Sequence, residues 1–398
     1  MDELVRCMHR AEVVMTFERL SLPLLLVGGL VSCSESITTS PVPDMAPVFP
    51  DTGPDRADFG VFDQGIPDPV DMGEPEDMGP PRFNDPAALF EGQRSIANAR
   101  MRIQVRGSET STLTPILMLS HGPSVGFEYL VEPTDFLLGP GGVEDPNRLV
   151  FFIDLPGAGR SDEGSLSRPD VTIENQYAFL IIAIEEYFHT FDDRPYDVIG
   201  HHFGGLIATL LANRRPDLVE DVVLISPYPL TFAERGIYNS AYRTSERISA
   251  SDRQFINDLQ GVPRCFFDPN QCALEIYLIF ARTWVCREND PAFQTLDIRF
   301  VSAGGISGFG PTNLYPGSIV EDWEANPFDL ASETAGVQAR TTMITGACDL
   351  IPETTYDMYA QIPGLTRIEF DESGHFPMVE QPELFEQAIF QALDSEDF

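Results

Sequence analysis

Residues 196–205 read Tyr-Asp-Val-Ile-Gly-His-His-Phe-Gly-Gly, and this stretch decides the fold. Its first half is a β-type apolar run that ends at Gly200, and a helical pattern begins near Phe203. The glycines on both sides allow a turn so tight that the residue at its tip is pushed out above a sheet. That residue is His202.

From about residue 95 onward, apolar runs alternate with amphipathic stretches. This alternation predicts an α/β fold, in which helices cover both faces of a mostly parallel sheet. The expected strands are Met101–Arg106, Pro115–Ser120, Leu149–Asp154, Tyr196–Gly200, Asp221–Ser226, Thr341–Gly346 and Thr366–Asp371. The expected helices include Ile173–Phe191, Phe203–Arg215 and Pro382–Leu393. The alternation lapses between Pro227 and about Gln338, which predicts an inserted, largely helical lid.

Four more motifs follow predicted strands. Residues 119–130 read Leu-Ser-His-Gly-Pro-Ser-Val-Gly-Phe-Glu-Tyr-Leu, and residues 152–162 read Phe-Ile-Asp-Leu-Pro-Gly-Ala-Gly-Arg-Ser-Asp. The glycine turns of the second stretch are expected to brace neighbouring loops. Further along, Asp349 comes just after one strand and His375 just after the last.

In this order, the motifs resemble those of the α/β-hydrolase superfamily over about residues 95–230 and 335–395. Residues 119–130 are similar, without gaps, to the HGGPG stretch and the following Glu-Tyr-Leu of proline iminopeptidases. The resemblance implies a catalytic acid at Asp349 and a catalytic base at His375.

The same resemblance implies an oxyanion hole made by the backbone N–H groups of Gly122 and Phe203. In the ungapped register, His121 stands at a family glycine. Another register would place Pro123 at the donor position, and proline has no N–H to donate. His201 stands where these families often carry a histidine for packing.

The departure from the family lies at His202, where a working hydrolase has serine. Without a hydroxyl, Asp349 and His375 have no nucleophile to activate. One interpretation is a degenerate hydrolase that binds a ligand or acts as a scaffold. A second is hydrolysis by a non-serine route, with His202 as nucleophile or as base for water. A third is a metal site formed by His202, His375, Asp349 and His121, although no cofactor is the simplest expectation.

The resemblance implies peptides with a free N-terminus, or small esters and amides, as ligands. In proline iminopeptidases, carboxylates of the lid hold the substrate amine. None of four acids in the predicted lid matches this role: Glu234, Glu246, Asp258 and Glu275.

The composition is strongly acidic, with 62 Asp and Glu against 25 basic residues and a net charge of −37. All of the basic residues are arginine. Such a surface repels phosphate backbones, so no nucleic-acid partner is expected. The sequence does not predict the oligomeric state.

Six cysteines are present, and none has zinc-site spacing. Cys265, Cys272 and Cys286 lie close together in the sequence, and Cys348 lies further on. A disulfide within the first three is plausible in an exported protein, but the pairing among all four stays open.

The N-terminal region resembles a bacterial lipoprotein signal. Residues 20–31 are apolar but too short to span a bilayer, and Arg19 precedes them. Leu30-Val31-Ser32-Cys33 resembles a lipobox, which implies lipidation of Cys33, and Met15 is the better start of such a signal. Ser34 then implies sorting to the outer membrane, so contact with a membrane is expected only through the lipid anchor.

Residues 34–86 are rich in Asp and Glu and carry a third of the 33 prolines. This composition predicts an extended, disordered tether. The predicted organisation is therefore a signal region (1–33), a tether (34–86), a first part of the hydrolase core (87–226), a lid (227–338) and a second part of the core (339–398).

Overall fold

The computed structural model describes residues 88–96, 99–122, 125–139, 148–159, 161, 172–257, 279, 281–286 and 327–393. The chain divides into two compact units, Met1–Met72 and Gly73–Phe398, and all described residues belong to the second. The predicted signal, Cys33 and the tether lie outside the described residues.

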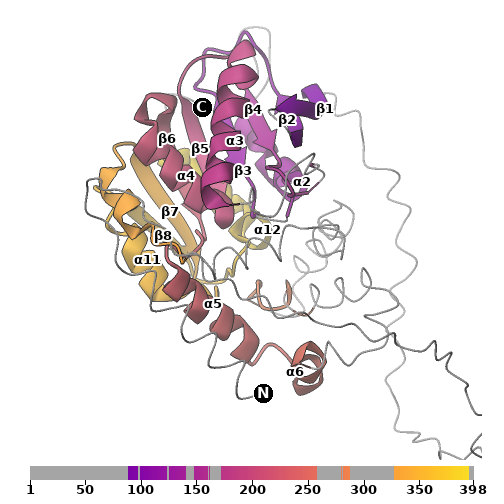
Figure 1. Cartoon of the computed structure of the whole chain (residues 1–398), viewed down its shortest axis with the longest axis vertical. Helices are drawn as coiled ribbons and strands as arrows, with labels where there is room; N and C mark the ends of the chain where they lie inside the picture. The colour runs from indigo at the N-terminus through magenta and orange to yellow at the C-terminus, as the bar shows by residue number, and fades with distance from the viewer. Residues whose placement is uncertain are drawn as a thin grey trace, which may run out of the picture. The chain divides into compact units, whose positions relative to one another are not determined.

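One sheet of eight strands runs through the described part of the chain in the order β1-β2-β4-β3-β5-β6-β7-β8 (Figure 1). The first two strands pair antiparallel, β2 is also antiparallel to β4, and all other neighbours are parallel. The strands are β1 (Ala88–Ile96), β2 (Ala99–Arg106), β3 (Ile116–Leu119), β4 (Val150–Ile153), β5 (Tyr196–His201), β6 (Val219–Ile225), β7 (Arg340–Gly346) and β8 (Thr366–Phe370).

The middle strands are the most buried part of the sheet, because helices pack against it. Every residue of β3, β4 and β5 is buried, as expected for parallel strands packed on both faces. Figure 1 shows α3 and α4 together in front of the sheet, and α4 packs on β3, β5 and β6. The C-terminal helix α13 packs on β6 and β7.

The α-helices differ in length, and short 3₁₀ segments lie between some of them. The α-helices are α2 (Glu128–Val131), α3 (Ile173–Glu186), α4 (Phe203–Arg214), α5 (Phe232–Thr244), α6 (Ala250–Asn257), α11 (Glu353–Tyr359), α12 (Pro377–Glu380) and α13 (Pro382–Ala392). The 3₁₀ segments are η1 (Glu132–Leu138), η3 (Phe188–Thr190), η4 (Pro216–Leu218) and η7 (Ala331–Gly336). Within the described residues, no helix has both the length and the apolar character needed to cross a membrane.

All seven predicted strands are present, with ends shifted by no more than a few residues. The strand β1 was not predicted, because its Ala-Leu-Phe-Glu-Gly-Gln-Arg-Ser-Ile sequence carries no clean alternation. An edge strand has only one neighbour, so its sequence is less constrained.

One helix is shorter than predicted. The expected Ile173–Phe191 helix ends at Glu186, and η3 follows as a separate turn. Tyr187 leaves the helical conformation, and its ring packs edge-on against Phe90 of β1. A tertiary contact to the edge strand therefore accompanies the early end of this helix.

Candidate active site

The turn between β5 and α4 has the strained form expected of a nucleophile elbow. His202 has φ 51° and ψ −113°, a conformation that non-glycine residues rarely adopt. A Cβ on Gly200 would overlap the carbonyl of Gly204, and one on Gly204 would overlap the carbonyl of Leu119. These glycines let strand, turn and helix approach closely enough to hold His202 at the tip.

The imidazole of His202 is held at both nitrogens and is 3% exposed. Its Nδ1 lies 3.1 Å from the carbonyl oxygen of His121. Its Nε2 lies 3.0 Å from the hydroxyl of Tyr238, which comes from α5. Burial raises the pKa of Tyr238 well above its ordinary value, so the phenol is neutral and donates this hydrogen bond. The ring at the elbow is thus fixed in place.

The predicted acid and base lie together. Nδ1 of His375 is 2.9 Å from Oδ2 of Asp349, and both side chains are buried. Tyr356 also donates to this carboxylate at 3.2 Å. Burial by itself would raise the pKa of Asp349, but attraction to His375 and its hydrogen bond outweigh burial and lower it. Asp349 is therefore ionised and fixes the proton of His375 on Nδ1.

The elbow meets this pair, since the ring centroids of His202 and His375 are 4.8 Å apart. Nε2 of His375 is the atom that would take a proton from a serine in a working triad. It is buried and has no hydrogen-bond partner among the described residues. The structure therefore brings His202, His375 and Asp349 into one arrangement, with an imidazole where the hydroxyl would stand.

The two residues predicted to supply the oxyanion donors, Gly122 and Phe203, are neighbours in the structure. A Cβ on Gly122 would lie 3.1 Å from the ring of Phe203. The N–H of Phe203, however, donates to the carbonyl of His121 at 3.2 Å. An oxyanion hole needs N–H groups aimed at the reacting oxygen. Here one donor is already engaged by the protein's own backbone.

His121 closes the site from the β3 side. Its ring stacks on that of His202 with centroids 3.9 Å apart, and it is 6% exposed. At this place the proline iminopeptidase pattern has glycine, which would leave space. The His121 ring and the His121 carbonyl therefore both occupy the neighbourhood of the elbow.

His201 has a structural role at the base of the site. Its Nδ1 lies 2.6 Å from the hydroxyl of Tyr129, which also accepts the backbone N–H of His121. Its Nε2 lies 2.9 Å from the carbonyl of His375. His201 thus ties the β3 loop, the elbow and the His375 loop together.

The three histidines in this cluster other than His375 are neutral near pH 7. Burial lowers the pKa of His121, His201 and His202 well below the ordinary value, and mutual repulsion lowers each further. These three uncharged imidazoles lie beside the Asp349–His375 pair.

The glycine turn after β4 braces the loop next to His121. Oδ1 of Asp154 accepts the N–H of Phe127 at 2.8 Å, and the Asp154 carbonyl accepts the hydroxyl of Ser161 at 2.5 Å. Gly126 and Gly159 pack so closely that a Cβ on either would overlap the other's backbone. This role matches the one expected of the motif.

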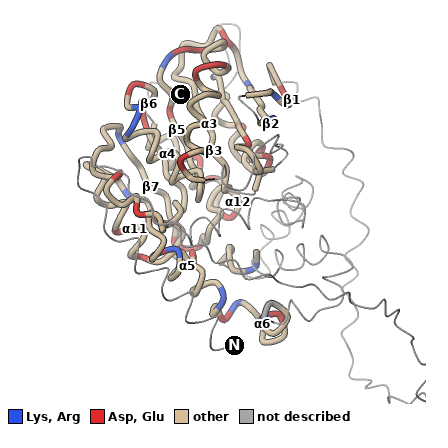
Figure 2. The backbone as a smooth tube through the Cα atoms, viewed as in Figure 1, with Lys and Arg blue, Asp and Glu red and all other residues tan. Residues whose placement is uncertain are grey.

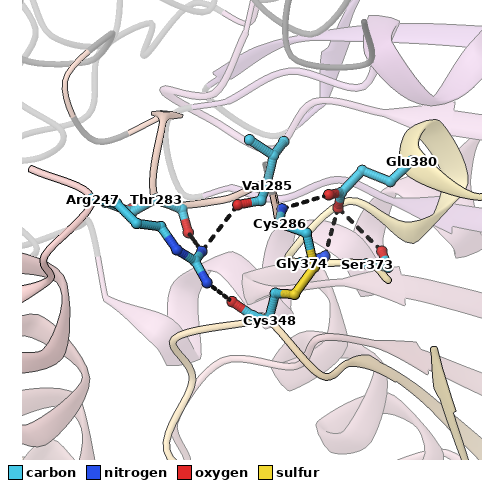
Figure 3. The surroundings of a disulfide bond; sticks show 8 residues. All are labelled: Arg247, Thr283, Val285, Cys286, Cys348, Ser373, Gly374 and Glu380. Atoms are coloured by element: carbon cyan, nitrogen blue, oxygen red, sulfur yellow. Dashed lines mark hydrogen bonds between the residues drawn. A yellow bond between two sulfur atoms is a disulfide. The ribbon is translucent and has the colours of Figure 1, made fainter. Parts of the chain in front are cut away.

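A disulfide joins Cys286 to Cys348, the residue before Asp349 (Figure 3). Cys286 therefore pairs with Cys348 and not with Cys265 or Cys272, the two cysteines near it in the sequence. Cys265 and Cys272 lie outside the described residues. The pairing follows from tertiary proximity, which the clustering of cysteines in the sequence does not reveal.

Hydrogen bonds around this disulfide hold residues 283–286, here called the strap, against the loops that carry Asp349 and His375. Figure 3 shows the guanidinium of Arg247 donating to the carbonyls of Thr283, Val285 and Cys348. On the other side, Glu380 accepts from the N–H of Cys286 and the N–H of Gly374. The loops that carry Asp349 and His375 are thus held by one strap.

Two of the four acids named for the predicted lid, Glu234 and Glu246, lie within the described residues. Glu234 is buried and accepts from the hydroxyl of Thr354 at 2.7 Å, so it ties α5 to α11. Glu246 is exposed, and Asp258 and Glu275 lie outside the described residues. Tyr238, the lid residue that contacts His202, was not predicted because a single tyrosine in an amphipathic helix carries no distinguishing signal.

An eight-stranded sheet with a strained elbow, a buried acid–histidine pair and this order of parts defines an α/β-hydrolase fold. The family model described as "Alpha/beta hydrolase family" matches residues 116–388. The chain belongs to this family.

The comparisons with individual proteins agree with the fold. An abhydrolase domain-containing protein, abhd-5.2 of Caenorhabditis elegans, is 34% identical over 79 residues, which is 20% of this chain and 17% of that protein. The match thus spans well under two thirds of the relative.

Among solved structures, VinJ aligns with a TM-score of 0.59 at 16% identity and covers 77% of this chain and 99% of its own. Proline iminopeptidase of Mycobacterium smegmatis aligns with a TM-score of 0.54 at 17% identity, covering 77% and 99%. A proline iminopeptidase-related protein of Thermus thermophilus gives 0.56 at 16%, covering 76% and 96%. At these identities the likeness concerns the fold.

Proposed function

We propose that this protein is an α/β-hydrolase family member that has lost serine-dependent hydrolysis and retains a ligand-binding role. The observation that carries the proposal is the elbow itself. The side chain at its tip is a buried imidazole hydrogen-bonded at both nitrogens, and one oxyanion donor is satisfied by the His121 carbonyl. Loss of the nucleophile alone costs several orders of magnitude in triad enzymes.

The geometry gives less support to His202 as a nucleophile. Its Nδ1 faces a carbonyl, which can only accept, so that nitrogen carries the proton. Acylation at Nε2 would require this proton to leave, and the His121 carbonyl cannot take it. His375, the base expected to relieve it, faces the ring edge-on, with 80° between the planes.

The ligand class follows from the resemblance to proline iminopeptidases and stays part of the proposal: a small molecule or a peptide with a free N-terminus. Export and lipid anchoring through Cys33 are proposed on the lipobox alone. Radiolabelled palmitate should be incorporated in the native bacterium and lost with Cys33→Ala. Equal labelling of the unmodified protein and the Cys33→Ala variant would contradict lipid anchoring through Cys33.

The proposed loss of hydrolysis is tested by assaying the protein on p-nitrophenyl esters and amino-acid anilides in EDTA. The unmodified protein should show no turnover above buffer, because no hydroxyl stands at the elbow. His202→Ser should gain esterase or aminopeptidase activity, since Asp349 and His375 already pair at 2.9 Å. Turnover by the unmodified protein that His375→Ala abolishes would overturn the proposal in favour of a non-serine hydrolase.

A further inference from the structure

Three imidazoles meet at the elbow in a way that serine chemistry does not require. His121 follows β3, His202 follows β5 and His375 follows β8, so three separate segments supply them. One ring nitrogen from each lies within 4.8 Å of the others. All three side chains are at most 6% exposed.

The hydrogen-bond partners assign the tautomer of each ring. Nδ1 of His121 lies 3.0 Å from the Gly122 carbonyl, and Nδ1 of His202 lies 3.1 Å from the His121 carbonyl. Nδ1 of His375 lies 2.9 Å from the ionised Asp349. Carbonyl and carboxylate oxygens only accept, so every Nδ1 carries a hydrogen, and the neutral form of each ring then presents a lone pair at Nε2.

These lone pairs are poorly satisfied by protein groups. Within the described part of the chain, Nε2 of His121 and Nε2 of His375 have no hydrogen-bond partner. Nε2 of His202 accepts from Tyr238 at 3.0 Å. Buried acceptors without donors are unfavourable, and a shared cation would satisfy all three at once.

The surrounding contacts are those of a metal site. Histidine ligands characteristically donate their second ring N–H to a carboxylate or a backbone carbonyl, which orients the ring and raises its basicity. All three rings do so here. Three neutral imidazoles with a further position left over suit Zn²⁺ in particular.

We propose that Nε2 of His121, His202 and His375 bind one divalent transition-metal ion of the zinc class at the elbow. Asp349 lies behind His375 as the orienting carboxylate, not as a ligand. Tyr238, released from His202, lies beside the fourth position. The proposal rests on this cluster and does not depend on the loss of serine chemistry.

Binding requires a small closure. Tetrahedral zinc at about 2.0–2.1 Å from nitrogen places its ligands roughly 3.3 Å apart. One ring nitrogen of each histidine now lies within 4.8 Å of the other two, and the rings of His121 and His202 are stacked with 24° between their planes. The His121 ring must therefore tilt so that its lone pair converges with the other two.

The test is titration of the full-length chain, stripped with EDTA and dialysed, with Zn²⁺ by calorimetry and with Co²⁺ by visible absorption. One Zn²⁺ per chain should bind, and Co²⁺ should give the intense d–d bands of a tetrahedral nitrogen site. His121→Phe and His202→Phe keep a ring but remove a ligand, so each should weaken Zn²⁺ binding more than about 100-fold. Asp349→Asn should weaken it by about 10- to 100-fold.

His189→Phe is the matched control, because this histidine stacks on Tyr196 outside the cluster. It should leave Zn²⁺ binding unchanged. Far-UV circular dichroism confirms that each variant is folded, and the Co²⁺ spectrum of the unmodified chain needs no variant. Failure of that chain to bind one Zn²⁺, or equal binding by His121→Phe, overturns the metal site. Because the hydrolase assays run in EDTA, neither result alters the outcome expected for His202→Ser.

Discussion

His202 stands on a backbone turn of the kind that holds the nucleophile in α/β-hydrolases. The positive φ, the tight glycines and the pairing of His375 with Asp349 are all features of a serine site. The tip residue and His121, which stands at a family glycine in the ungapped register, depart from that pattern. The two departures touch, because their rings stack at 3.9 Å.

This contact leads to a prediction about restoring hydrolysis. His202→Ser leaves the His121 ring beside the new hydroxyl, whereas His121→Gly/His202→Ser opens the space and returns the family's glycine. We expect the double variant to exceed the single variant in kcat/KM on p-nitrophenyl acetate by about tenfold or more, since removing an obstruction of about 1.4 kcal/mol in the transition state corresponds to that factor.

The matched control is His121→Gly alone, which restores space but no nucleophile and should stay inactive. Equal activity of the single and double variants would show that His121 does not obstruct the site. The ratio of kcat/KM values is the quantity that decides between these outcomes.

At the scale of elements, the site depends on contacts that hold separate loops of the chain together. The strap at residues 283–286 contacts the Asp349 loop through the disulfide, and its Trp284 carbonyl accepts the N–H of His375 at 2.6 Å. The segment 283–286 is thus joined to both loops that carry Asp349 and His375.

The disulfide closes a sequence separation of 62 residues. In the chain-entropy account, such a loop contributes about 4 kcal/mol by restricting the unfolded chain. We expect Cys286→Ser/Cys348→Ser to lose about that much free energy of unfolding, as measured by urea denaturation. Because the strap also holds the Asp349 loop, His202→Ser in this background should lose activity.

The unmodified chain treated with dithiothreitol is the control and should match the double cysteine variant. An unchanged urea midpoint in both would show that Arg247 and Glu380 hold the strap without the covalent bond.

At the scale of the whole molecule, a strongly acidic composition contrasts with uncharged histidines in the interior. Figure 2 shows acidic and arginine residues interspersed along the periphery of the described sheet and helices. Some arginines pair with two acids, as Arg214 does with Glu174 and Glu333. The net charge of −37 nevertheless means that acids far outnumber cations. The interior, by contrast, holds His121, His201 and His202 as neutral imidazoles.

This cluster predicts a loss of stability in mild acid. His121, His201 and His202 have lowered pKa values when folded, so between their folded values and about 6.5 the unfolded chain binds protons that the folded chain does not. Stability is therefore full above about pH 6.5 and falls as the pH decreases. Three such groups give a slope of up to about 4 kcal/mol per pH unit.

The measurement is urea unfolding between pH 7.5 and pH 5 in EDTA and high salt, where surface repulsion is screened. His201→Gln removes one of the three titrating imidazoles and should reduce the slope by about one third. A slope that is the same in both proteins would show that these histidines do not govern the acid response.

Elements with a local sequence signal were predicted, and elements without one were missed. The β5 run, the glycines around His202 and the alternation after residue 95 carry local signals, and they predicted seven strands, the elbow and the positions of Asp349 and His375. The edge strand β1 was missed because its sequence has no clean alternation. The lid contact of Tyr238 was missed because nothing near it in the chain differs from an ordinary amphipathic helix.

The sequence by itself therefore determined the fold and placed an imidazole at the tip of the elbow, since backbone turns and strand patterns depend on neighbouring residues. Only the tertiary structure decided which nitrogens face which oxygens. It put Asp349 behind His375 and not among the candidate metal ligands, stacked His121 on His202, and paired Cys286 with Cys348. These relations join residues far apart in the chain, and no local pattern records them because they form only when the sheet brings its loops to one edge.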